Sequence, residues 1–220
     1  MKQSKRLLAV LGAVCALNFI GHLICLPFLP DVIPVHWNFA GQADGWGPKE
    51  TNLIQAALPA LMLLLLWFLP RIDPKGQNFE KFAPLWRGTM TGIVLFFCAL
   101  TWVFVLAAFG VLPDGIMGML IGGGIGVLFI LLGNYMPRAR QNYTFGCRTP
   151  WALADEHNWA RTQRMGGITF IIMGAVILLT GMLGGVLGEV PVLVLLLGVT
   201  LGGVVWIYVY SFLVFKGWMK

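Results

Sequence analysis

The pattern of charged and apolar positions divides the chain into six long apolar segments. Asp, Glu, Lys and Arg are absent from residues 7–30, 51–70, 88–113, 115–137, 165–188 and 190–215. A bilayer hydrocarbon core of about 30 Å needs about 20 apolar residues at a rise of 1.5 Å each. Each segment is therefore long enough to hold one helix that spans a membrane.

The same segments favour helices over strands. Strands of a membrane barrel alternate apolar and polar residues, whereas residues 61–66 (LMLLLL) and 193–197 (LVLLL) do not alternate. The first segment also exceeds the 7–15 apolar residues that are usual in a cleavable signal peptide, so we expect it to be retained. The sequence predicts an all-α fold: a polytopic membrane helix bundle with six transmembrane helices.

Composition and charge agree with this prediction and add an orientation. Charged residues make up 11% of the chain, too few to cover a soluble domain, which has about 25%. With the N-terminus in the cytoplasm, all Lys and Arg except Lys49 lie on the cytoplasmic side, as the positive-inside rule requires. We therefore predict cytoplasmic N and C termini. The net charge of +6 then reflects topology and anionic lipid headgroups, and indicates no direct binding of nucleic acid.

The connections between the segments predict the domain organisation. Residues 1–70 form a pair of transmembrane helices with an outer loop at 30–50, and a cytoplasmic loop follows at 71–87. Residues 88–220 form a four-helix membrane domain with a cytoplasmic loop at 137–165. The short connections at 113–115 and 188–191 predict antiparallel neighbours. Glycines recur every four or seven residues in the last three segments, which favours close packing of those helices over a glycine-lined ligand cavity. These glycines are Gly118, Gly122, Gly126, Gly133, Gly167, Gly174, Gly181, Gly188, Gly198 and Gly202.

Polar residues are rare inside the apolar segments. Asn18 and His22 are four residues apart and share one helix face. We expect them to form hydrogen bonds to another helix, with lining of a functional site as the alternative. No ionisable residue lies in the middle of the other five segments, which argues against an ion-coupled transporter. The four cysteines lack the spacing of a metal site.

The outer loop carries the first group of candidate site residues. Its prolines and glycines predict turns, and its two tryptophans suit a membrane interface. We expect a compact cap whose contact residues are Pro34, His36, Trp37, Asn38, Gly41, Asp44, Gly45 and Trp46. A metal site at His36 with Asp31, Asp44 and Glu50 is less favoured, because no second histidine stands at ligand spacing.

The inner loop carries the second group. The candidate residues are Asn134, Pro137, Asn142, Gly146, Arg148, Thr149, Pro150, Trp151, Trp159, Thr162 and Arg164. Thr149 before Pro150 predicts the start of a helix. Asp155 and Glu156 open a second short helix, on which His157, Arg161 and Arg164 form a basic stripe. We expect this stripe to lie beside Trp151 and Trp159, flat at the lipid headgroups. Recruitment of a cytosolic partner is the alternative.

Catalysis is less well supported than binding. The available sets are His36 with Asp31 and Asp44, or His157 with Asp155 and Glu156. Neither set pairs a nucleophile with an orienting base at convincing spacing, so we predict a protein that is not an enzyme and needs no cofactor or metal.

Both loops resemble a known family. Residues 133–167 (GNYMPRARQNYTFGCRTPWALADEHNWARTQRMGG) resemble the signature of the SdpI-type (SdpI/YfhL-like) immunity proteins. Residues 29–49 (LPDVIPVHWNFAGQADGWGPK) resemble the DUF1648 domain that precedes it. Gln163 stands where the family pattern Thr-His-Arg has histidine, and Ala152 and Ala154 replace the usual Thr and Ser.

The resemblance implies a multi-pass protein of the bacterial cytoplasmic (inner) membrane. Its implied function is resistance to a secreted antimicrobial peptide toxin that acts on membranes, with the outer loop as the contact surface. A second implied role is that of a signalling receptor, which holds a cytosolic ArsR-like repressor through the inner loop. A membrane signalling module without an immunity role is the alternative function, ahead of a membrane enzyme or a transporter.

Overall fold

Six long helices dominate the fold of the chain. The computed structural model describes residues 5–113 and 115–219, and within them six helices are long and apolar enough to cross a membrane. The prediction of six spanning helices is therefore confirmed. The helices are α1 (Lys5–Cys25), α2 (Thr51–Ile72), α3 (Ala83–Ala108), α4 (Ile116–Tyr135), α6 (Glu156–Leu187) and α7 (Glu189–Phe215).

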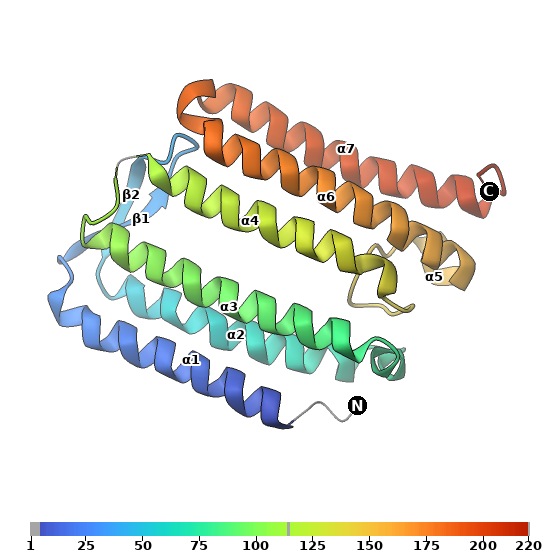
Figure 1. Ribbon diagram of the computed structural model, residues 1–220, viewed down its shortest axis with the longest axis horizontal. Helices are drawn as coiled ribbons and strands as arrows, with labels where there is room; N and C mark the ends of the chain where they lie inside the picture. Colours follow the sequence, from blue (N-terminus) through green and yellow to red (C-terminus); the bar gives the residue numbers. More distant parts are fainter. Residues whose placement is uncertain (1–4, 114, 220) are drawn as a thin grey trace.

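The six helices lie side by side with their long axes roughly aligned (Figure 1). Helices α1, α2 and α3 form one group, and α4, α6 and α7 form the other. The start of α1 and the end of α7 lie at one end of the bundle, which we call the terminal end. The opposite end carries a small β-sheet, and we call it the hairpin end.

The hairpin end contains two strands that an all-α fold does not include. Strand β1 (Val32–Trp37) pairs antiparallel with β2 (Ala43–Pro48). The turn between them is closed by Asn38, whose backbone N–H donates to Gln42 O at 2.9 Å. The expected outer cap is thus a β-hairpin. Its prolines and glycines indicated turns, and β1 (VIPVHW) does not alternate apolar and polar residues and contains Pro34, so periodicity did not predict a strand.

Glycines bring the backbones of α4 and α6 into contact. A Cβ atom on Gly126 would stand 2.6 Å from the carbonyl oxygen of Gly174, and one on Gly174 would stand 2.6 Å from that of Gly126. A Cβ atom on Gly133 would likewise stand 2.6 Å from the carbonyl oxygen of Gly167. The prediction of close packing is confirmed for these two helices.

The same prediction is wrong for two glycines of α7. A Cβ atom on Gly198 or Gly202 would meet nothing within 4 Å, so neither residue brings α7 close to a neighbour. The approach of α7 to α6 occurs instead at Gly203, where a Cβ atom would stand 2.9 Å from the Thr169 side chain. Periodicity identifies a glycine face but does not decide whether a helix or lipid lies against it.

At the terminal end, parts of the predicted loops are helical. Helix α3 begins at Ala83, with Pro84 in its first turn, so the connection from α2 is shorter than 71–87 and contains the 3-10 turn η2 (Gly76–Glu80). The Thr149 side chain caps α5 (Pro150–Ala154), as predicted.

The short helix expected to lie flat at the headgroups is not separate from the bundle. Asp155 caps a single helix of 32 residues, α6, by accepting a hydrogen bond from the backbone N–H of Asn158 at 2.7 Å. No proline interrupts the chain between this cap and the apolar span. The predicted interfacial helix is therefore the first part of a spanning helix.

Candidate functional site

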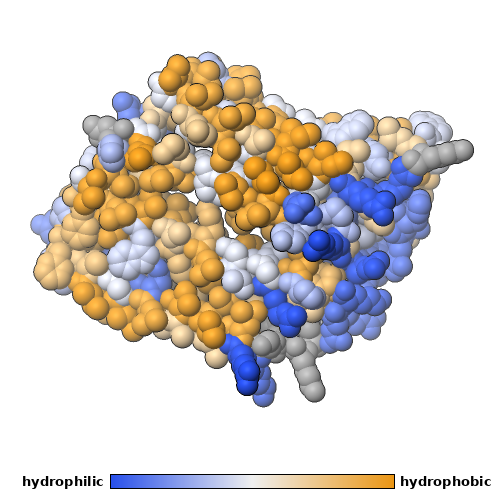
Figure 2. Space-filling view, in the orientation of Figure 1, coloured by the Kyte–Doolittle hydropathy of each residue, from blue (hydrophilic) through white to orange (hydrophobic). Residues whose placement is uncertain are grey.

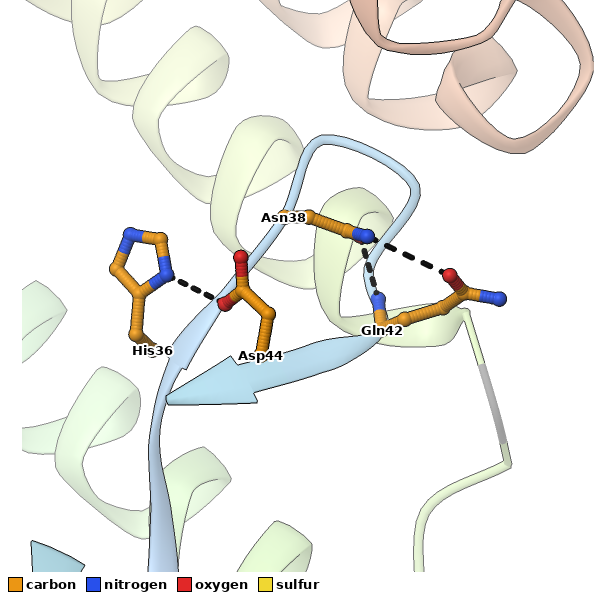
Figure 3. A network of polar contacts seen from close by, with 4 residues as sticks. All are labelled: His36, Asn38, Gln42 and Asp44. Carbon is orange, nitrogen blue, oxygen red and sulfur yellow. Dashed lines mark hydrogen bonds and ion pairs between the residues drawn. The ribbon is translucent and has the colours of Figure 1, made fainter. Parts of the chain in front are cut away.

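The hairpin carries a polar pair on its exposed face. His36 on β1 and Asp44 on β2 point toward each other, and His36 Nδ1 lies 2.5 Å from Asp44 Oδ1 (Figure 3). In the turn, Asn38 Oδ1 accepts a hydrogen bond from the backbone N–H of Gln42 at 3.0 Å. These bonds hold the two strands together at the tip.

The remaining outer-loop candidates divide into buried and exposed residues. Pro34 and Gly41 are buried. Trp37 stacks on Phe104 of α3, with ring centroids 5.1 Å apart, and so attaches the hairpin to the bundle. A Cβ atom on Gly45 would stand 2.8 Å from the Cβ of His36, so glycine permits the close pairing of the strands. Of this group, His36, Asp44 and Trp46 are exposed.

A second ion pair lies at the base of the hairpin. Lys49 Nζ donates to Asp31 Oδ1 at 2.7 Å. The hydrogen bond and the positive charge of Lys49 lower the pKa of Asp31, and the same bond raises the pKa of Lys49. Asp31 therefore pairs with Lys49 and does not join His36 and Asp44. Among residues 5–113 and 115–219, no group of three His, Cys, Asp or Glu side chains is placed to hold a metal ion.

The hairpin tip docks on the second group of helices. A Cβ atom on Gly41 would stand 2.4 Å from the carbonyl oxygen of Gly115, at the start of α4. A Cβ atom on Gly184 of α6 would stand 2.4 Å from the carbonyl oxygen of Phe39. Beside the tip lies a cavity of about 380 Å³, which we call the tip cavity. Its lining includes Phe39, Met119, Met182 and Val186. Gly118 and Gly181 also line it, so the less favoured alternative of a glycine-lined cavity does occur at this end of α4 and α6. Sequence reasoning did not identify its location or its other walls, which come from distant segments.

Asn18 and His22 connect α1 to its neighbours, as expected. His22 Nδ1 lies 2.8 Å from Asn52 Oδ1, and Asn18 Nδ2 donates to the carbonyl oxygen of Ala56 at 3.3 Å. Because the amide oxygen of Asn52 can only accept, the proton of this bond belongs to His22 Nδ1. The His22 ring also contacts Trp102 of α3, at 4.7 Å between centroids. These contacts join α1, α2 and α3 near the hairpin end.

At the terminal end, buried polar side chains attach one segment to the bundle. We call it the signature segment (residues 133–167). Asn158 is fully buried, and its Nδ2 donates to the carbonyl oxygen of Ser211 on α7 at 2.8 Å. Its Oδ1 accepts from Ser211 Oγ at 2.8 Å and from Thr162 Oγ1 at 2.9 Å. Thr149 Oγ1 lies 2.5 Å from Ser211 Oγ. These hydrogen bonds therefore connect α5, α6 and α7. We call the four residues the Asn158 network: Asn158, Thr162, Thr149 and Ser211.

Two further side chains fold the loop before α5 onto the bundle. Trp159 is 2% exposed, and its Nε1 donates to the carbonyl oxygen of Ala139 at 2.8 Å. The expectation that Trp159 lies at the lipid headgroups is therefore wrong, because this loop covers it. Asn142 Oδ1 accepts from the backbone N–H groups of Thr144 and Phe145, at 3.0 and 2.6 Å.

Asp73, just after α2, is a residue that sequence reasoning missed. Its Oδ2 accepts from Tyr143 N and from Thr144 Oγ1, both at 2.8 Å. The side chain is buried although it lies in a connection. Asp73 thus attaches the first helix group to the signature segment.

Gln163 forms a pair of hydrogen bonds with one residue of the loop. Its Oε1 accepts from Cys147 N at 3.1 Å, and its Nε2 donates to Cys147 O at 2.9 Å. Gly146 has a φ of +96°, and a Cβ atom there would stand 2.6 Å from Gln163 Oε1. Gln163, which stands in place of the family's histidine, therefore satisfies the backbone N–H and carbonyl of Cys147. Gly146 leaves the space that the Gln163 side chain needs. Burial raises the pKa of the Cys147 thiol to about 11, so the thiol stays protonated at neutral pH.

Replacing Gln163 by alanine is expected to lower the free energy of unfolding by about 2 kcal/mol, because two buried backbone groups of Cys147 lose their partners. Histidine should restore only part of this loss, since the two ring nitrogens point away from each other and cannot both reach Cys147. Thermal or denaturant unfolding of the purified protein measures the change. Gln77→Ala, at an exposed position of η2, is the matched control. Equal stability of Gln163→Ala and Gln77→Ala would contradict the role given to this amide.

The other signature residues remain accessible. Asn134, Pro137, Arg148, Pro150 and Arg164 are exposed. Trp151 is half-buried against Phe212, with 5.2 Å between ring centroids. The signature segment thus combines a buried polar interior with an exposed cationic surface.

Comparison with known proteins matches both ends of this structure. Residues 138–211, which contain the Asn158 network, match the SdpI/YfhL protein family, and residues 13–63, which contain the hairpin, match a domain of unknown function, DUF1648. The chain is 26% identical over 197 residues to the protein "Immunity protein SdpI" of Bacillus subtilis (strain 168). The match covers 87% of this chain and 88% of that protein. No solved structure matches. The resemblance inferred from the two loops is confirmed.

Proposed function

We propose, from the premise that this chain is a distant homologue of the SdpI/YfhL immunity proteins with a DUF1648 segment, that it protects a bacterial cell from a secreted membrane-active peptide. The observation that carries the proposal is the arrangement of the hairpin end. There the hairpin presents an exposed tryptophan, Trp46, on its second strand, and its tip borders the apolar tip cavity. Such a surface suits an amphipathic peptide that reaches the membrane from outside.

Charge supports placing the hairpin end outside the cell. Hydrophilic side chains gather at the terminal end, to the right in Figure 2, and the sides of the helices are apolar. The basic residues of the α2–α3 connection and of the signature segment lie at this end. At the hairpin end, Lys49 is neutralised by Asp31. By the positive-inside rule, this distribution supports a cytoplasmic terminal end.

The exposed apolar side chains of the hairpin end provide the contact surface. Trp46 is 62% exposed, and Val186, at the rim of the tip cavity, is 87% exposed. A peptide that inserts into the outer leaflet would bury its own apolar face against these groups. Binding at this depth would keep the peptide from assembling in the bilayer. His36 and Asp44 add a polar pair that orients the peptide backbone.

Expression in a toxin-sensitive bacterium tests the proposal. Cells that carry the wild-type protein should survive a peptide dose that kills cells with empty vector. Trp46→Ser should reduce protection by about tenfold, the size of effect expected for an exposed aromatic contact. Trp218→Ser is the matched control, because Trp218 is 71% exposed but follows the end of α7, at the terminal end. Equal killing of wild-type and vector cells by several such peptides would refute the immunity function.

The exposed arginines of the signature segment favour a second candidate function. Arg148 and Arg164 lie on the proposed cytoplasmic face, and Trp151 of the same segment is half-buried against Phe212. This surface would hold a cytosolic ArsR-like repressor at the membrane. A fluorescently tagged repressor should move to the membrane with wild-type protein and stay in the cytosol with the Arg148→Ala, Trp151→Ala double variant. If the repressor stays in the cytosol with the wild-type protein, the signalling role is excluded.

A further inference from the structure

A groove at the terminal end has a cationic rim and apolar walls. It lies between residues 143–149 and the helices α6 and α7, and its volume is about 430 Å³. Arg148, Tyr143 and Tyr208 line the groove, and Phe170, Val204 and Ile207 form its apolar side. We call it the Arg148 groove. Thr149 of the Asn158 network also lines the groove, and Arg148 belongs to the surface proposed for a repressor, but the proposed peptide contact does not use it.

Arg148 is held at the rim but is not neutralised. Its Nη1 donates to the carbonyl oxygen of Tyr143 at 2.8 Å, which uses one of the five N–H donors of the guanidinium. Within the part of the chain that the structure describes, no carboxylate forms an ion pair with Arg148. The remaining donors are available to an anion, and guanidinium binds phosphate oxygens with charge-assisted hydrogen bonds.

The groove lies at the depth of a membrane interface. Trp206 and Tyr208 are exposed on α7, less than three turns before the helix ends at Phe215 and is followed by Lys216. Exposed Trp and Tyr near the end of a spanning helix mark the level of the lipid headgroups. An anion bound at Arg148 would therefore lie where phospholipid phosphates lie.

An apolar track leads away from the rim toward the bilayer centre. Leu197, Leu201, Val204 and Tyr208 follow the spacing i, i+4, i+7, i+11 and so share one face of α7. All four side chains are exposed. The track is long enough for an acyl chain whose headgroup lies at the rim.

We propose that the Arg148 groove binds one anionic phospholipid of the surrounding leaflet. The phosphate accepts hydrogen bonds from Arg148, and the Tyr143 and Tyr208 side chains lie beside it. One acyl chain lies on the face of α7 that contains Leu201 and Val204. The lipid then joins the signature segment to α7 from outside, next to Thr149 of the Asn158 network.

The test uses the whole purified protein in phosphatidylcholine nanodiscs with increasing phosphatidylglycerol. Lipids that remain bound are counted by native mass spectrometry. The wild-type protein should retain one phosphatidylglycerol in preference to phosphatidylcholine. Arg148→Gln should weaken this retention by about tenfold. Val204→Trp, which fills the groove and keeps all charges, should weaken it to a similar degree.

Arg164→Gln is the matched control, because Arg164 is an exposed arginine of the same segment that does not line the groove. It should retain the lipid as the wild-type protein does. If Arg164→Gln and Arg148→Gln lose phosphatidylglycerol equally, the lipid is attracted by the overall positive charge of the segment and not by the groove. That result would overturn the proposal. Glycerol phosphate, which has no acyl chains, should not displace the lipid. Full displacement by it would also overturn the proposal, because the groove would then be a site for a soluble anion.

Discussion

Gly126→Val is expected to lower the free energy of unfolding by about 3 kcal/mol, the upper part of the range for overpacked positions. A Cβ atom at Gly126 would stand 2.6 Å from Gly174 O and 2.8 Å from Leu178 N, and both are backbone atoms that cannot rotate away. Helices α4 and α6 would have to separate. Close packing is the main force between helices in lipid, so separation also weakens the contact at Gly133 and Gly167.

Gly123→Val is the control for this prediction, because a Cβ atom at Gly123 would meet nothing within 4 Å. Both variants place the same β-branched residue in α4, so they share any change in helix propensity, which is below about 1 kcal/mol. Unfolding in mixed micelles with increasing sodium dodecyl sulfate measures both. If the two variants unfold at the same detergent fraction, the backbone contact between α4 and α6 does not stabilise the bundle.

The spanning helices could be predicted from the sequence because charge is costly in lipid. The gaps between charged residues mark the spans closely, although α3 and α6 extend past Arg87 and Arg164 into the predicted loops. Long side chains near helix ends reach the interface, so a charge there does not end a helix. Glycine spacing predicted the α4–α6 contact but failed at Gly198 and Gly202, because lipid and a neighbouring helix are equally apolar.

The hairpin could be predicted only in part. Its turn residues were visible in the sequence, and Asn38 and Gly41 do form the turn. The docking of the tip on α4 and α6 could not be foreseen, since it depends on Gly115 and Gly184, which are far away in the chain. Trp37 was expected to be a contact residue for a ligand, and its stacking on Phe104 is a contact within the protein.

The signature segment shows a different limit of sequence reasoning. Thr149 and Thr162 were among the inner-loop candidates, and the cap role of Thr149 was predicted. Their burial was not predicted, because polar residues between spans are usually exposed. Their burial depends on Ser211, a polar residue inside the last span that no motif marks. A serine in so apolar a segment was the available signal, since buried polar groups need hydrogen-bond partners.

Asn158→Ala is expected to lower the free energy of unfolding by about 3 kcal/mol. The substitution removes one donor and one acceptor, so the carbonyl oxygen of Ser211 and the hydroxyls of Ser211 and Thr162 lose partners in a fully buried site. Each stranded buried group costs about 1–3 kcal/mol, and part of this is recovered when Ser211 Oγ turns fully toward Thr149.

A double-mutant cycle separates this network from a general loss of packing. Ser211→Ala alone should destabilise the protein, and after Asn158→Ala it should cost at least 1 kcal/mol less, because residues in one hydrogen-bond network do not contribute additively. Asn134→Ala, an exposed amide on α4, is the control and should change the free energy of unfolding by less than about 0.5 kcal/mol. Strict additivity of Asn158→Ala and Ser211→Ala would mean that the two side chains act independently. The attachment of α7 to the signature segment would then have to come from apolar contacts such as that between Trp151 and Phe212.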